Sequence, residues 1–135
     1  MNTTMQTGQI LHNGTPWVAR VEVAATLFDR MRGLIGRPSL PAGHGLLIEA
    51  CGSIHTLGMR FPIDVIFLDR AWQVRRVVRQ VRPGRLMIRG GWHGLRALEV
   101  ASGWLDLDGV AAGTQLAWQP TTGSPGDVPP VPPVA

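Results

Sequence analysis

Apolar and polar residues alternate along several short segments of the chain, and a period of two is typical of half-buried β-strands. In residues 17–23 every second side chain is apolar, namely Trp17, Ala19, Val21 and Val23. The other face of this predicted strand consists of Val18, Arg20 and Glu22. Further strands are predicted at residues 45–50, 95–100 and 114–118, and residues 53–59 either continue the 45–50 strand or pair with it.

A β-hairpin is predicted in the middle of the chain. Residues 62–69 are apolar on both faces except at Asp64, as expected for an inner strand. After a turn at residues 69–72, residues 73–81 return with Val74 and Val78 on one face and Val77 and Val81 on the other. The two strands are therefore expected to pair with each other.

One short helix is predicted ahead of the 45–50 strand. Its apolar residues follow helical spacing at Leu27, Met31 and Leu34. Thr26 is a candidate N-cap, and Gly33 or Gly36 is a candidate stop signal. Several short strands, glycine-containing turns and a single helix predict a mainly β fold, a small β-sandwich or barrel with one short helix.

The chain of 135 residues is long enough for one hydrophobic core. Residues 1–119 are expected to form a single β-domain, and residues 120–135, which hold six of the eleven prolines, a disordered tail. Because Cys51 is the only cysteine, the chain can form neither an intramolecular disulfide nor a zinc-finger motif. Neither a signal-peptide pattern nor an apolar run of about 18 residues is present, so a soluble cytoplasmic protein without a membrane span is expected.

Positive charge is concentrated in one part of the chain. All 13 basic residues are arginines, the formal net charge is +4, and no acid lies between Asp69 and Glu99. Seven arginines fall within residues 70–89, at positions 70, 75, 76, 79, 82, 85 and 89. Such a stripe either forms a solvated surface or attracts an anionic partner such as nucleic acid. The chain has no recognised nucleic-acid-binding motif, which favours the solvated surface.

The central part of the chain resembles a known prokaryotic family, the domain of unknown function 192. The matching elements, in order, are the RGLIGR segment (32–37), the HTLGMRFPID segment (55–64), FLD (67–69), Pro83 with Arg85, and Leu98-Glu99 with Gly103. The resemblance implies a mainly β, jelly-roll-like fold. It implies no established activity and no cofactor, so the function has to be inferred from the residues themselves.

Residues 51–69 concentrate chemically reactive and polar side chains within apolar sequence. The candidate ligand-binding residues are Cys51, His55, Thr56, Met59, Arg60 and Asp64. Our leading interpretation is a non-enzymatic module that binds a small molecule or a protein partner in a polar cleft at these residues, next to the arginine stripe. The sequence identifies no catalytic residue with certainty.

The alternative interpretation is a small hydrolase or redox-type enzyme with Cys51 as nucleophile and His55 as base. Arg60 would then stabilise the thiolate and Asp64 would orient the imidazole. Against this, a lone cysteine after an apolar strand is typically a small buried hydrophobe. On an extended strand the two residues lie about 13 Å apart, too far to share a metal ion, so we expect no metal site and no cofactor.

Asp64 is the most informative acid of this segment because a buried carboxylate requires hydrogen-bond donors. Thr56, His55, Arg32 and Arg37 are the donors that we expect. Two roles remain open for Asp64: a structural fastener at a corner of the fold, or a carboxylate that binds the ligand.

Overall fold

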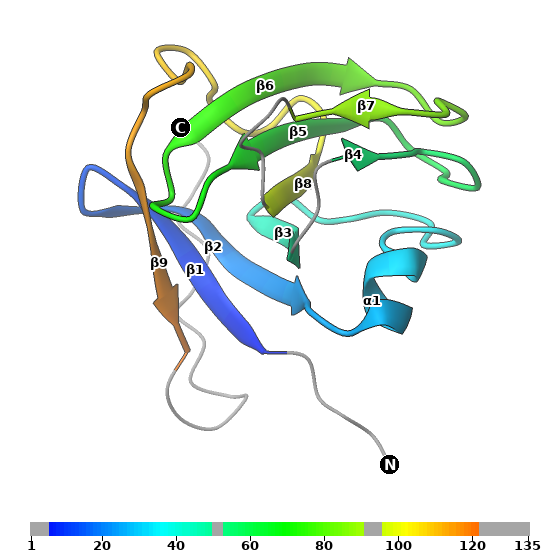
Figure 1. Ribbon diagram of the computed structural model, residues 1–135, viewed down its shortest axis with the longest axis horizontal. Coiled ribbons are helices and arrows are strands. Elements are labelled where there is room, and N and C mark those ends of the chain that lie inside the picture. The colour runs from blue at the N-terminus through cyan, green and yellow to red at the C-terminus, as the bar shows by residue number, and fades with distance from the viewer. Residues whose placement is uncertain (1–5, 50–52, 91–95, 122–135) are drawn as a thin grey trace.

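The computed structural model describes residues 6–49, 53–90 and 96–121. Strands dominate this part of the chain, and the single helix is short (Figure 1). The elements are β1 (Thr7–His12), β2 (Thr15–Ala24), α1 (Leu27–Arg32), β3 (His44–Glu49), β4 (Ser53–Ile54), β5 (Ile63–Leu68), β6 (Val74–Val81), β7 (Ile88–Arg89), β8 (Arg96–Ala101) and β9 (Leu116–Pro120). The predicted mainly β fold with one short helix is confirmed.

Seven strands form one sheet in the order β6-β5-β8-β3-β2-β1-β9, and β4 pairs with β7 in a separate two-stranded sheet. Only β2 and β3 run parallel within the large sheet; the other neighbours are antiparallel. The sheet curls into a half-barrel, so that its two ends approach each other (Figure 1). There Gln73 forms a bridge to Gln115, and Trp72 stacks on Trp118 with ring centroids 5.8 Å apart.

Strand β5 lies inside the sheet and is buried along its whole length, as predicted. Its side chains alternate between two apolar cores on opposite faces of the sheet. Ile66 and Leu68 belong to the first core, which the 105–110 segment also enters. Ile63, Val65 and Phe67 belong to the second core, to which β4, β7 and Leu34 also contribute. The apolar character of both faces of β5 thus reflects two separate cores.

The predicted alternation in β6 is wrong, because β-bulges interrupt the strand. Val74 and Val77 both pack in the first core, whereas Val78 and Val81 both pack in the second. The register with β5 shifts twice, and one extra residue on one strand moves the following side chains to the opposite face. In β2 a similar shift against β1 places Val18 in the same core as Val21.

The prediction for residues 53–59 is also wrong. Of this segment only Ser53–Ile54 is a strand, and it pairs with Ile88–Arg89, not with β3. The short strands β1 and β7 were not predicted. β1 contains only two apolar side chains, Ile10 and Leu11, which are adjacent and show no period of two, and two-residue strands such as β7 are too short to show a period.

The helix begins and ends where the sequence predicts. The hydroxyl of Thr26 accepts a hydrogen bond from the Asp29 N–H at 3.1 Å, which caps the first turn. Gly33 ends the helix with a φ of 49°, a conformation that glycine adopts without steric penalty. Leu34 follows and is buried in the second core. In the described residues no helix has both the length and the apolar character needed to cross a membrane.

Candidate ligand pocket around Glu99

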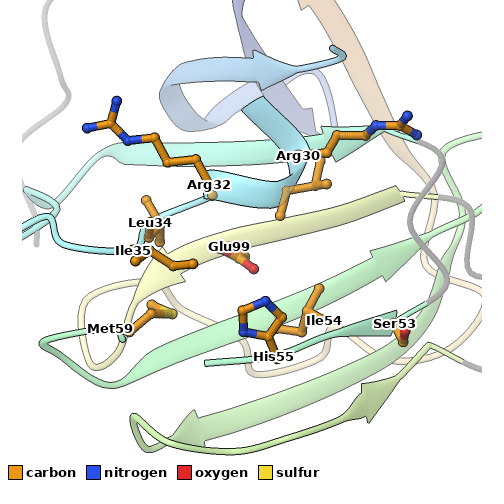
Figure 2. Close-up of a pocket in the computed structure, with 11 residues that line it drawn as sticks. Arg30, Arg32, Leu34, Ile35, Ser53, Ile54, His55, Met59 and Glu99 are labelled. Atoms are coloured by element: carbon orange, nitrogen blue, oxygen red, sulfur yellow. The ribbon is translucent and has the colours of Figure 1, made fainter. Parts of the chain in front are cut away.

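A small pocket opens on the face of the sheet that carries the second core. It has a volume of about 70 Å³ and lies between the end of α1, strand β4 and the central strand β8 (Figure 2). Its apolar lining consists of Leu34, Ile35, Ile48, Ile54 and Met59. Its remaining lining residues are Arg30, Arg32, Gly33, Ser53, His55 and Glu99. The pocket therefore combines apolar walls with polar groups from three different elements.

Glu99 lies on β8 and is only 2% exposed. Its cross-strand neighbours are Leu46 on β3 and Val65 on β5, both of them apolar and buried. None of the described residues forms a hydrogen bond or an ion pair with its carboxyl group. Burial in these surroundings disfavours the charged form and raises the pKa of Glu99 to about 8. The carboxyl group is therefore largely protonated at neutral pH, and it can both donate and accept a hydrogen bond.

The two arginines of the pocket do not neutralise this acid. Figure 2 shows the guanidinium groups of Arg30 and Arg32 directed away from Glu99, on either side of the helix end. The Nε atom of Arg30 is itself buried and has no hydrogen-bond partner among the described residues. Buried polar groups in proteins almost always have a partner. Two groups of the pocket lining, on Glu99 and Arg30, thus lack one within the described chain.

Two of the predicted site residues line this pocket. His55 follows β4 directly, is exposed, and lies opposite Glu99 in Figure 2. Met59 is 7% exposed and forms part of the apolar wall. The turn that carries both residues is held in place by the neighbouring Thr56.

Thr56 is fully buried and lies outside the pocket lining. Its hydroxyl donates to the carbonyl of Arg82 at 2.7 Å and accepts from the N–H of Arg85 at 2.8 Å. Backbone hydrogen bonds from Thr56 to Arg85 and from Gly84 to Thr56 reinforce this contact. The geometry makes Thr56 a fastener between the segment after β4 and the 82–85 loop.

Asp64 is also distant from the pocket. By the alternation along β5 it shares a face with Ile66 and Leu68, opposite to the face of Glu99. One of its carboxylate oxygens accepts hydrogen bonds from the N–H of Gln80 at 2.8 Å and from the hydroxyl of Ser102 at 2.7 Å. The predicted donors, Thr56, His55, Arg32 and Arg37, are therefore wrong. The actual donors come from the two strands that pair with β5, because Gln80 lies in β6 and Ser102 directly follows β8. This geometry matches the structural role.

The remaining predicted site residues are Arg60 and Cys51. Arg60 is exposed and does not line the pocket. Cys51 lies outside the described residues, so the Cys51–His55 pair stays a prediction. His44 lines a different hollow beside Arg20 and Glu22, and in the described ranges no three histidine, cysteine or acidic side chains converge as metal ligands would.

Glu99 was not among the site residues predicted from the sequence. The available signal was a single acid within the predicted apolar strand at residues 95–100, on the same face as Ala97. A charged residue inside an otherwise apolar strand indicates either an edge position or a special environment. Here the pairing of β8 with both β3 and β5 excludes the edge position.

The fold and the pocket define a small half-barrel β-domain with an open pocket of mixed apolar and polar lining. The chain belongs to the DUF192 family, described as "Uncharacterized ACR, COG1430", whose model matches residues 9–118. It is 32% identical over 111 residues to a UPF0127 protein of Thermococcus sibiricus, covering 78% of this chain and 70% of that protein. The predicted family resemblance is thereby confirmed.

Two crystal structures share the fold. One is from Sinorhizobium meliloti, is provisionally described as a transcription regulator, and superimposes with a TM-score of 0.73 at 19% identity, covering 87% of this chain and 98% of that one. The other is a protein of unknown function from Novosphingobium aromaticivorans, with a TM-score of 0.71 at 20% identity and coverages of 83% and 84%. At these identities the similarity concerns the fold alone.

Proposed function

We propose that this domain is a non-enzymatic binding module, and that its pocket receives a compact hydrogen-bonding group of a small ligand or a protein partner. The observation that supports this most directly is the buried Glu99 carboxyl group without a partner among the described residues. Leaving such a group unsatisfied costs about 1–3 kcal/mol. A ligand that hydrogen-bonds to Glu99 would remove this cost.

The size and lining of the pocket restrict the ligand group. A volume of about 70 Å³ is well below the roughly 300–1,000 Å³ of typical pockets for small molecules. The pocket is therefore too small for a whole cofactor, but it accommodates the polar end of a side chain or of a small molecule. The apolar walls at Ile48, Ile54 and Met59 suit a short aliphatic stem behind that polar end.

The protonation state of Glu99 distinguishes two kinds of ligand group. A primary amide complements a neutral carboxyl group, because each side offers one donor and one acceptor. An ammonium group instead favours the ionised carboxylate and lowers its pKa. Amide binding should therefore weaken as the pH rises through the pKa of Glu99, and ammonium binding should strengthen.

The test is a titration of the full chain with propionamide and with propylammonium, followed by NMR chemical shifts of backbone amides. A fragment of this size is expected to bind with a Kd on the order of millimolar. Shifts should concentrate at Glu99, His55 and Met59 and should be lost in Glu99→Leu, which removes the acceptor and the donor.

A matched control is Glu22→Leu, which changes a partly exposed glutamate on β2 outside this pocket. It should bind both probes as the wild type does. The proposal fails if neither probe shifts the pocket residues, or if Glu99→Leu folds and still binds both probes with unchanged affinity.

A further inference from the structure

A second hollow lies between strands β6 and β7, and it differs from the Glu99 pocket in both size and charge. Its volume is about 280 Å³. Four arginines line it, namely Arg76, Arg79, Arg85 and Arg89. The remaining lining residues are Val78, Gln80, Val81, Met87 and Ile88. We refer to this hollow as the arginine groove; it has basic walls and an apolar floor.

The positive charge of the groove is poorly compensated. No acid lines it, and Arg85 has no acidic partner in the described chain. Arg79 lies 3.7 Å from Asp108, but that carboxylate is 92% exposed, and such a surface pair contributes little. Close positive charges without counter-charges repel one another, so an anionic group that enters the groove is attracted by all of them.

Each of the other two arginines has a hydrogen-bond partner beside the groove. Arg76 donates to the backbone carbonyl of Arg89 at 2.6 Å, which links the strands on both sides of the groove. The Nε of Arg89 in turn contacts the sulfur of Met87 at 3.2 Å. A side chain that is already ordered loses less conformational entropy when it binds a partner.

The backbone of β6 adds a second feature. This strand is at one end of the seven-stranded sheet, and among the described strands it pairs along its length with β5 alone. Only its start is covered, where Val74 exchanges hydrogen bonds with Gly113 and Thr114. From Arg76 onward, every residue of β6 except Val77 lines the groove. An exposed strand edge presents N–H and C=O groups that can pair with an added strand.

We propose that the arginine groove binds an acidic segment of a partner protein in extended conformation, as an additional strand beside β6. Side chains of an added strand point alternately to opposite sides. Carboxylates on one side of the segment would meet the arginines, while apolar side chains on the other would pack on Val78, Val81 and Ile88. This surface is separate from the Glu99 pocket, so the inference does not depend on the function proposed above.

Nucleic acid is the competing anionic partner. Single-stranded nucleic acid is usually held by aromatic side chains on which bases stack, in addition to basic groups. Among the described residues, no aromatic side chain lines the groove. An apolar floor beside a strand edge suits a peptide better than a phosphate backbone.

The test measures fluorescence anisotropy of a labelled peptide of alternating glutamate and valine, mixed with the full chain at low salt. Binding is expected, and Arg85→Glu should weaken it by about tenfold or more. The matched control is Arg70→Glu, which makes the same charge change at an exposed arginine in the β5–β6 turn, outside the groove. It should retain nearly the wild-type affinity.

A second probe is the same peptide with its alternate backbone nitrogens methylated, which removes strand pairing but keeps the carboxylates. It should bind more weakly than the parent peptide. The proposal is overturned if the parent peptide does not bind, if Arg70→Glu and Arg85→Glu weaken it equally, or if methylation has no effect. It is likewise overturned if a single-stranded oligonucleotide binds tightly and displaces the peptide.

Discussion

Gln80 donates its backbone N–H to the carboxylate of Asp64 at 2.8 Å, and it does so from a left-handed conformation with a φ of 54°. The two residues lie where the register between β5 and β6 shifts, with Ile63 opposite Val81 and Val65 opposite Val78. A bulge leaves a backbone group without its usual ladder partner. The Asp64 side chain provides a partner for Gln80 and so stabilises the bulge.

Replacement of Asp64 by alanine should therefore destabilise the fold. It removes the acceptor for the Gln80 N–H and for the Ser102 hydroxyl, and each buried group left unpaired costs about 1–3 kcal/mol. A loss of several degrees in Tm is expected in thermal unfolding. Asp64→Asn retains an acceptor oxygen and should lose less. If Asp64→Ala melts like Asp108→Ala, a control at an exposed acid, the fastening role is wrong.

This part of the fold illustrates what the sequence does and does not predict. The apolar pattern of β5 predicts an inner strand, and the position of Asp64 within it predicts that the carboxylate must accept hydrogen bonds. The donors are not predictable in the same way. Ser102 is far away in the sequence, and the Gln80 N–H is available only because of a bulge, which a regular period of two does not reveal.

Thr56 provides a second test of a structural role. Thr56→Val keeps the shape of the side chain but removes the hydroxyl that bonds Arg82 and Arg85. Since these backbone groups then lose a buried partner, we expect a destabilisation of about 1–3 kcal/mol in urea-induced unfolding. Thr56→Ser preserves the hydroxyl and serves as the matched control. Equal stability of the valine and serine variants would exclude the fastening role.

Gly8 is the third test, because its position in β1 leaves no space for a side chain. A Cβ atom there would lie 2.5 Å from both the ring of Trp118 and the carbonyl oxygen of Gln119 on β9. Gly8→Ala should therefore separate β1 from β9 and cost about 1–3 kcal/mol. Thr7→Ala, at the exposed neighbouring position, should change the Tm little. A Gly8→Ala variant as stable as wild type would contradict the close contact with Trp118.

The candidate pocket was harder to predict than the fold. His55 and Met59 were selected from sequence and do line it, because the turn after β4 carries both. Glu99 comes from a strand more than forty residues away in sequence. It lines the same pocket as His55 because β8 lies between β3 and β5, and this order of strands cannot be read from a pattern of apolar residues.

The pH dependence of stability provides the last prediction and concerns Glu99. Burial raises the pKa of Glu99 from an ordinary value of 4.5 to about 8 in the folded state. Between these two pH values the folded protein binds more protons than the unfolded chain. The free energy of unfolding should therefore decrease as the pH rises from about 4.5 to about 8, by at most about 1.4 kcal/mol per pH unit from this one group. Above about pH 8 Glu99 is ionised in both the folded and the unfolded state, so this group causes no further change in the free energy of unfolding.

Glu99→Gln removes the ionisable group while keeping a similar shape, so this component of the pH dependence should disappear. The measurement is urea-induced unfolding of both proteins across this pH range. Glu22→Gln, at a partly exposed glutamate, is a control that should show the same pH dependence as the wild type. The difference in stability between Glu99→Gln and wild type should grow in favour of the variant as the pH rises. Parallel curves for the two proteins would contradict this prediction. They would show that Glu99 has an ordinary pKa in the folded state, because a partner compensates for the burial of its carboxylate.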